Sequence, residues 1–271
     1  MKPRKRTYLF LSVVALLSLF PFYYSIVVAS HDNSVLGQVP PPLTLGGNLM
    51  NNLERAFGED VHMVQGLINS LLASSVITFS QVFFATLAGF AFAKLKWRGK
   101  NAVLLFIIAT MMVPTQLAVI PLFILMSNYE LVGTLPAVII PFLVSAFGVF
   151  FMTQYLTTAV PTELIEAARA DGCTTIRIFW HVVLPAARPA AAVLGILTFL
   201  SAWNEFFWPL VVMNAENPTV QTVLSNLSSG RVADVSLILT GATIAIVPLI
   251  IVFSLLGKHI IGGIMQGAVK S

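Results

Sequence analysis

Charge is scarce in this chain: only 10% of its 271 residues are charged, whereas 57% are hydrophobic. A composition this apolar excludes an ordinary water-soluble domain and favours a protein that crosses a membrane several times. Cysteine is almost absent, and the single Cys173 excludes an intrachain disulfide, so we interpret it as a small residue of a polar loop. The net charge of +4 does not indicate a nucleic-acid partner, because it accompanies so much apolar sequence.

The sequence also lacks the motifs of an enzyme. Gly99-Lys100 and Gly257-Lys258 have neither the upstream glycine nor the following Ser or Thr of a phosphate-binding loop. There is no zinc-type histidine pair, no cysteine cluster and no nucleophile motif, and the four histidines fall in polar stretches. We therefore predict that the chain is not an enzyme, that it does not hydrolyse ATP, and that it holds no cofactor or metal of its own.

Six apolar stretches, each near or above the ~20 residues that cross a bilayer, organise the sequence. They cover about residues 8–29, 64–93, 102–125, 135–156, 187–212 and 235–256. The first stretch follows Lys2, Arg4, Lys5 and Arg6, and it is longer than the core of a signal peptide and has no evident cleavage site. We predict an all-α, polytopic membrane protein in which residues 1–271 form one transmembrane domain.

The distribution of basic residues predicts the orientation of this domain. Of 15 Lys and Arg residues, only Arg55 and Arg231 fall in the loops assigned to the outside. Because cytoplasmic loops carry an excess of Lys and Arg, we expect both termini to be cytoplasmic. The polar segment 161–185 is expected on the same side.

The segment 161–185 has the pattern of two short helices separated by glycine. We expect the first helix to begin at Pro161, with Glu163 and Glu166 near the positive end of its dipole, and to stop at Asp171-Gly172. Arg169 is placed three residues after Glu166, where the two can pair. The segment presents apolar surface and charge together, which suits the docking of a partner protein, although isolated charges in a loop are usually only solvated.

The second short helix is expected to begin at Thr174 or Thr175 and to end at Leu184-Pro185. One side of it would carry Ile176, Phe179, Trp180 and Val183.

Glu205 is an acidic residue inside the fifth apolar stretch, where a charge is costly and commonly marks a pathway or a buried partner. Aromatic side chains beside polar groups suit sugar rings, and the polar Asn69 in the second stretch could line the same path. The candidate substrate-pathway residues are Trp203, Asn204, Glu205, Phe206, Trp208 and Asn69. Helix packing or an interfacial aromatic belt is the alternative reading of the aromatic residues, and we weigh it somewhat above the pathway.

Three motifs resemble the permease subunits of ABC importers. Glu166-Ala167-Ala168, followed by Gly172 and Leu184-Pro185, is similar to the EAA loop of that family, although Val182 stands where Ile is usual. The stretch Trp203–Leu210 is similar to a signature of the carbohydrate branch, and so is the tail at 266–270.

The resemblance implies the type I ABC importer permease fold and a location in the bacterial plasma membrane. It assigns contact with the ATPase to Glu163, Glu166, Ala167, Ala168, Arg169, Asp171, Gly172, Ile176, Leu184 and Pro185. It also implies four kinds of partner besides the lipid bilayer: a second homologous permease, two copies of an ATPase subunit that bind ATP and Mg, an extracellular solute-binding protein and a sugar.

Other readings stay open at this stage. The cargo is expected to be a di- or oligosaccharide, but a polyol or glycerol phosphate fits the residues as well. An alternative is an ion-coupled secondary transporter with Glu205 as its coupling carboxylate, although the absence of repeats and of paired intramembrane acids disfavours it. A third is a membrane assembly protein without a transport role.

Overall fold

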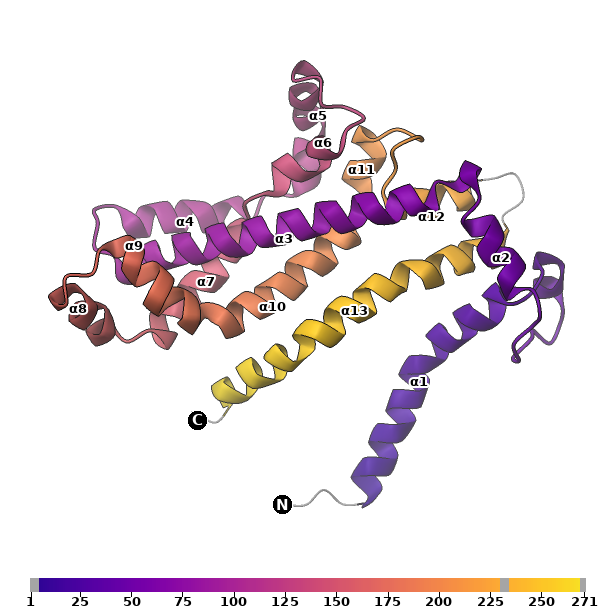
Figure 1. Ribbon diagram of the computed structural model, residues 1–271, viewed down its shortest axis with the longest axis horizontal. Helices are drawn as coiled ribbons and strands as arrows, with labels where there is room; N and C mark the ends of the chain where they lie inside the picture. Colours follow the sequence, from indigo (N-terminus) through magenta and orange to yellow (C-terminus); the bar gives the residue numbers. More distant parts are fainter. Residues whose placement is uncertain (1–4, 230–233, 269–271) are drawn as a thin grey trace. The chain divides into compact units, whose positions relative to one another are not determined.

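The computed structural model describes residues 5–229 and 234–268, and every regular element within these ranges is a helix (Figure 1). Lys2, Arg4, Arg231 and the last residues of the 266–270 tail motif lie outside the described residues. The α-helices are α1 (Lys5–Ala29), α2 (Leu49–Ala56), α3 (Met63–Lys94), α4 (Lys100–Thr110), α5 (Val119–Asn128), α6 (Leu135–Ile139), α7 (Ala146–Ala159), α8 (Thr162–Ala170), α9 (Thr175–Ile178), α10 (Leu184–Trp203), α11 (Phe207–Val212), α12 (Val220–Ser228) and α13 (Val235–Ala268). Shorter 3-10 turns are η1 (Asn33–Gly37), η2 (Glu59–Val61), η3 (Thr115–Ala118) and η4 (Ile140–Phe142), and η5 (Phe179–Val183) is a π-helical turn.

Four helical stretches are long and apolar enough to cross a membrane: Lys5–Ala29, Met63–Lys94, Thr175–Trp203 and Val235–Leu255. Two bent helix pairs raise the number to as many as six, if each pair counts as one span. The first pair, Lys100–Thr110 with Thr115–Asn128, bends by 87°, and the second, Leu135–Phe142 with Ala146–Ala159, bends by 42°.

The sharper bend lies directly before Pro114, in the third apolar stretch. Pro114 itself has an extended backbone (φ −60°, ψ 127°) and caps the next turn. A proline disfavours the helical conformation of the residue before it, so the helix ends ahead of Pro114. Pro121 lies in the first turn of α5, where its missing N–H group removes no helical hydrogen bond.

The chain forms two compact units, of which the first comprises residues 1–67 and 218–248. Only the last three residues of α1, Val27 to Ala29, are buried. Next to them the buried Asn52 donates hydrogen bonds to the carbonyls of Ala29 (3.0 Å) and His31 (2.9 Å). Arg55 donates to Asn52 Oδ1 (3.2 Å) and pairs with Asp234 (2.5 Å). These bonds join the end of α1, the helix α2 and the start of α13.

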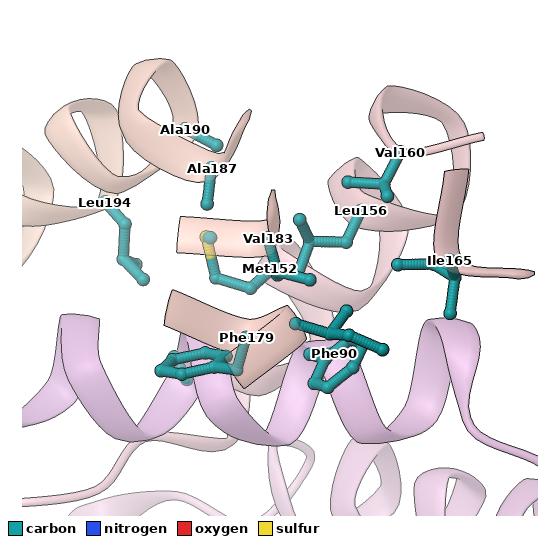
Figure 2. Close-up of a cluster of buried hydrophobic side chains, with 12 residues drawn as sticks. Phe90, Met152, Leu156, Val160, Ile165, Phe179, Val183, Ala187, Ala190 and Leu194 are labelled. Carbon is teal, nitrogen blue, oxygen red and sulfur yellow. The ribbon is translucent and has the colours of Figure 1, made fainter. Parts of the chain in front are cut away.

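The second unit comprises residues 68–217 and 249–271, and its core lies where α3, α7 and the 165–194 segment meet. Figure 2 shows Met152 and Leu156 of α7 between Phe90 and Phe179 on one side and Val183, Ala187 and Leu194 on the other. A Cβ atom added to Gly89 would lie 2.8 Å from Cβ of Met152. The glycine therefore lets α3 and α7 approach closely, as small residues do between membrane helices.

Two predicted boundaries are wrong. The second short helix does not end at Leu184-Pro185, because α9, η5 and α10 continue as one helix from Thr175 to Trp203. Pro185 is the second residue of α10, directly after the π turn, where a helix tolerates a residue without an N–H group. The predicted stretch 187–212 is not continuous either, since α10 ends at Trp203 and α11 begins only at Phe207.

The Arg55–Asp234 pair makes the first unit sensitive to acid. Burial raises the pKa of Asp234, but the hydrogen bonds from Arg55, the Leu237 N–H group and the Ser236 hydroxyl outweigh it, so the pKa lies below its usual 3.8. A carboxylate with a lowered pKa stabilises the fold above its unfolded-state value, and this contribution is lost as the pH falls through the folded-state value.

We expect Asp234→Asn to lower the stability of the folded chain at neutral pH by up to about 1 kcal/mol, the range of a partly exposed ion pair. The measurement is thermal unfolding of the detergent-solubilised protein at about pH 7 and about pH 3. The difference between wild type and variant should shrink at the lower pH. A difference of equal size at both pH values would contradict the role of the charge.

Candidate functional site

The first helix of the 161–185 segment is α8, and its turn is built around Gly172. Pro161 occupies the N-cap position with an extended backbone, so the helix begins one residue later than predicted, at Thr162. At the other end the N–H groups of Gly172 and Cys173 donate to the carbonyls of Arg169 (3.0 Å) and Ala168 (2.9 Å). These two bonds form a Schellman motif, which requires a left-handed residue after the helix. Gly172 supplies it, with φ +79°.

The second helix begins at Thr174, one of the two predicted caps, whose hydroxyl accepts the N–H group of Arg177 (3.4 Å). The predicted apolar side is wrong in part. Phe179 and Val183 are buried, whereas Ile176 and Trp180 are 72% and 50% exposed. The segment packs through Phe179, whose ring lies 6.1 Å from that of Phe90 in α3, and this contact turns Ile176 and Trp180 away from the core.

One residue of α8 anchors it to the second unit, and the others are available to a partner. Ile165 is 2% exposed and belongs to the core cluster shown in Figure 2. Ala168 is partly buried and packs against the same cluster. The remaining predicted docking residues of this loop are exposed: Glu163, Glu166, Ala167, Arg169, Asp171, Gly172 and Ile176. Leu164, which is 48% exposed, adds an apolar side chain that the motif did not indicate.

The predicted pairing of Glu166 with Arg169 does not form within the described residues. Both side chains point into solvent instead, so their charges remain available to another protein. Leu184 is half-buried and Pro185 exposed, at the junction of η5 and α10. Together, α8 and α9 form a small exposed surface, and α9 is continuous with a membrane-length helix.

The tryptophans proposed for the substrate pathway are structural in this chain. Trp203 is 1% exposed and stacks on Phe199, with ring centroids 5.8 Å apart. Trp208 is 3% exposed, and its indole N–H donates to the carbonyl of Ala137 (2.9 Å). Trp208 therefore joins α11 to α6, and Trp203 stacks within α10.

Glu205 lies in the break between α10 and α11 and not inside a helix. Its Oε1 atom accepts the backbone N–H group of Trp208 (3.1 Å), one of the N–H groups at the start of α11 that has no helical partner. Asn204 donates from its side chain to the carbonyl of Leu200 (2.8 Å), at the end of α10. Asn204 is exposed and Phe206 is 36% exposed, so these two candidates remain accessible.

Asn69 is buried and hydrogen-bonded. Its side-chain amide donates to Asn217 Oδ1 (2.7 Å), and the Asn217 amide donates in turn to the carbonyl of Gly133 (3.1 Å). Asn69 thus links α3 to the loop after α11 and to the loop before α6. The six pathway candidates are not brought together into one polar site.

A set of polar contacts that the sequence did not indicate stabilises the bend between α6 and α7. The amide of Gln81 donates to the carbonyl of Phe142 (2.7 Å), and the hydroxyl of Ser80 donates to that of Leu143 (2.8 Å). The hydroxyl of Thr198 in α10 donates to Gln81 Oε1 (3.3 Å). Carbonyls freed by a helix break in lipid need such partners. In the sequence, the glutamine in the apolar run of α3 and the proline Pro141 could have indicated these contacts.

No group of three or more His, Cys, Asp or Glu side chains in the described part of the chain is placed to hold a metal ion. The arrangement presents exposed apolar and charged side chains on α8 and α9 and connects them to a long helix.

Comparisons with known proteins agree with this arrangement. A family model described as "binding-protein-dependent transport system inner membrane component" matches residues 81–265. The arabinooligosaccharides transport system permease protein AraQ of Bacillus subtilis is 32% identical over 265 residues, which cover 97% of this chain and 94% of that protein. The lactose transport system permease protein LacG of Rhizobium radiobacter is 31% identical, and the match covers 97% and 95% of the two chains.

The fold matches as well. A crystal structure of a bacterial ABC transporter involved in the import of the acidic polysaccharide alginate contains a similar chain, with a TM-score of 0.77 and 22% identity. The match covers 94% of this chain and 95% of that one. The prediction of an all-α permease fold is thereby confirmed.

The Gly172 turn generates a prediction about stability. No atom lies within 4 Å of a Cβ built at Gly172, so a larger side chain there costs only the strain of the left-handed backbone. We expect Gly172→Val to destabilise the folded chain by about 1–3 kcal/mol, and Gly172→Asn to cost clearly less because Asn tolerates this conformation. Thermal unfolding of both variants in detergent measures the difference. Equal unfolding temperatures for the Val and Asn variants would contradict the left-handed backbone conformation at Gly172.

Proposed function

The chain belongs to the family of binding-protein-dependent transport system inner membrane components, the permease subunits of ABC importers, and we propose that its cargo is a di- or oligosaccharide. The observation that carries the proposal is the pair of relatives at 32% and 31% identity, which match nearly the whole chain and are named for arabinooligosaccharide and lactose transport. The protein is a multi-pass inner-membrane protein and a transporter subunit, not an enzyme.

Membership of the family implies a partner permease, an ATPase and a binding protein in general. We assign the composition as one homologous permease beside this chain, two ATPase copies that bind ATP and Mg, and one extracellular solute-binding protein. The largely exposed α1 supports the assignment of a second permease, since its apolar surface needs contact with lipid or another membrane helix.

We assign α8 and α9 as the elements that dock to the ATPase. Exposed Leu164, Ala167 and Ile176 offer apolar contact area, and exposed Glu163, Glu166 and Arg169 set the register of docking through charge. The Schellman turn at Gly172 holds the two helices at a defined angle. Because α9 continues through η5 into α10, a displacement of the docked surface is passed to a membrane-spanning helix.

Transport then follows from differential binding. ATP closes the ATPase pair, the docked segment moves with it, and the permease pair turns its path toward the binding protein. Such alternating exposure is a shift between two states that ATP and the loaded binding protein bind with different affinities. We place both termini and the 161–185 segment in the cytoplasm, as the basic residues indicate.

An ion-coupled transporter that works alone is not favoured. Its proposed coupling carboxylate, Glu205, already accepts the N–H group of Trp208 and serves as a helix cap. The family, moreover, is described as dependent on a binding protein.

The role of Glu205 is tested by two substitutions. Glu205→Gln keeps a side-chain oxygen for the Trp208 N–H group, whereas Glu205→Ala removes it. We expect the Gln variant to retain uptake within about twofold and the Ala variant to lose about 0.5–2 kcal/mol of stability, the worth of a helix cap. The measurements are initial uptake rates and unfolding temperatures of the reconstituted importer. Loss of uptake in the Gln variant, with an unchanged unfolding temperature, would contradict the cap role and restore the coupling role.

The proposed function is tested by uptake into proteoliposomes that contain the complete importer and internal ATP. We expect ATP-dependent uptake of arabinooligosaccharides or lactose-type disaccharides that stops when the ATPase subunit is omitted. Uptake by this chain alone, abolished by an uncoupler and indifferent to ATP, would overturn the proposal.

The docking surface is tested in the same uptake assay with two alanine-to-arginine substitutions, one on the surface and one as a control. Ala167→Arg places a bulky cation on the exposed face of α8, and Ala159→Arg makes the same change at an exposed alanine at the end of α7. We expect the first variant to lose uptake about tenfold or more, which corresponds to ~1.4 kcal/mol of docking energy, and the second to remain near wild type. Normal uptake by Ala167→Arg would contradict the assigned surface.

A further inference from the structure

An apolar groove of about 320 Å³ lies between the end of α3 and the α9–η5 segment, both in the second unit. Phe83, Leu87 and Ala91 line it from α3, and Ile176, Phe179 and Trp180 line it from the other side. Phe90 and Phe179, which belong to the core cluster drawn in Figure 2, also line the groove, so the groove adjoins this core. Leu87 is 41% exposed and Trp180 is 50% exposed, so the groove is open to the outside of the chain.

The position of the groove on α3 points to the depth where a bilayer changes from hydrocarbon to headgroups, for the following reasons. Helix α3 has 32 residues and is therefore about 48 Å long, which exceeds the ~30 Å hydrocarbon core. The lining residues belong to the last turns of this helix, next to Lys94 at its end. Trp97 folds back on this end, with its ring 5.5 Å from that of Phe92, as expected for an aromatic residue at a membrane interface.

Basic side chains stand at this end of the groove. Lys96 and Arg98 follow directly after Leu95, which lines the groove, and Arg177 follows Ile176. Lys94 and Lys100 use their ammonium groups on backbone carbonyls of Thr157, Phe92 and Leu95. Within the described residues, the exposed side chains of Lys96, Arg98 and Arg177 form no ion pair.

We propose that this groove binds an anionic phospholipid of the cytoplasmic leaflet, with an acyl chain between α3 and η5 and the phosphate held by Lys96, Arg98 and Arg177. An apolar slot that opens beside unpaired cations matches a lipid with a negatively charged headgroup, which combines both chemistries in one molecule. A zwitterionic lipid offers the same acyl chain without the net charge, so the basic residues select against it.

The bound lipid would act on the docking surface. Ile176 and Thr175 line the groove and also belong to the helix assigned to ATPase docking. An acyl chain in the groove fills the space beneath these residues and supports α9 in its docked position. This consequence rests on the proposed function, whereas binding of the lipid itself does not.

The test uses the complete importer in nanodiscs of phosphatidylcholine with about one fifth phosphatidylglycerol. The lipid that remains bound after extraction into detergent is identified by native mass spectrometry, without ATP or sugar. We expect wild type to retain phosphatidylglycerol in preference to phosphatidylcholine. In the double variant Lys96→Gln/Arg98→Gln, the preference for phosphatidylglycerol should fall about tenfold or more, because each removed charge contributes roughly fivefold.

Two controls separate the groove from general effects. Lys5→Gln/Arg6→Gln removes the same charge at the start of α1, and it should retain the lipid as wild type does. Ala91→Phe fills the groove and should lose bound lipid of both kinds, whereas Ala102→Phe, at an exposed alanine of α4, should not.

Equal retention of both lipids by wild type, or unchanged retention in Lys96→Gln/Arg98→Gln, would overturn the proposal. A photo-cross-linker at Leu87 that reacts with the ATPase or with the partner permease instead of lipid would overturn it as well. Failure of lipid retention in an importer with normal ATP-driven uptake refutes the lipid site alone. Retention without any ATP-driven uptake refutes the proposed function and leaves the lipid site standing.

Discussion

The packing of Phe179 and Val183 against α3 and α7 is the contact on which the rest of the second unit depends. These two side chains are 2% and 0% exposed, and they bind the start of the long 175–203 helix to Phe90, Met152 and Leu156 (Figure 2). The π turn at η5 keeps the helix continuous through this contact. Without this packing contact, α8 and α9 would be part of a loop that is not fixed to the core. With this contact in place, they form the exposed end of a membrane-spanning helix.

The proposed docking surface therefore has two connections to the rest of the unit. Ile165 fastens α8 to the core, and the Schellman turn at Gly172 fixes α8 against α9. The exposed charges of Glu163, Glu166 and Arg169 take no part in either connection. The residues that hold the segment to its own chain are thus different from the exposed residues. The segment can therefore keep a fixed position while its exposed side chains contact a partner.

Two helix breaks elsewhere in the unit are capped by side chains. Glu205 accepts a hydrogen bond at the start of α11, and Ser80 and Gln81 donate to carbonyls at the bend before α7. In an apolar environment the backbone N–H and C=O groups that a helix break frees have no solvent partners. Polar side chains within the spans therefore form hydrogen bonds with these groups. The apparent cost of an acidic residue in the fifth stretch is explained by this local use.

The amino-acid sequence by itself determined the class of the fold, because six long apolar runs in a chain with few charges admit little else. It also determined the Gly172 turn and the Thr174 cap, since glycine and threonine act there through their own backbone and hydroxyl. These are local effects, and local chemistry is readable along the chain. The motifs of the docking loop and of the Trp203–Leu210 stretch were readable in the same way.

Only the tertiary structure decided which apolar residues face inward. Ile176 and Phe179 look alike as sequence, yet one is exposed and the other buried, because Phe179 packs on Phe90, which is distant in sequence. The same holds for Trp208, whose partner Ala137 lies 71 residues away. Continuity through Pro185 and the break at Asn204 were likewise set by packing and capping partners. Burial and hydrogen bonding between distant segments are properties of the folded chain, so no local pattern could specify them.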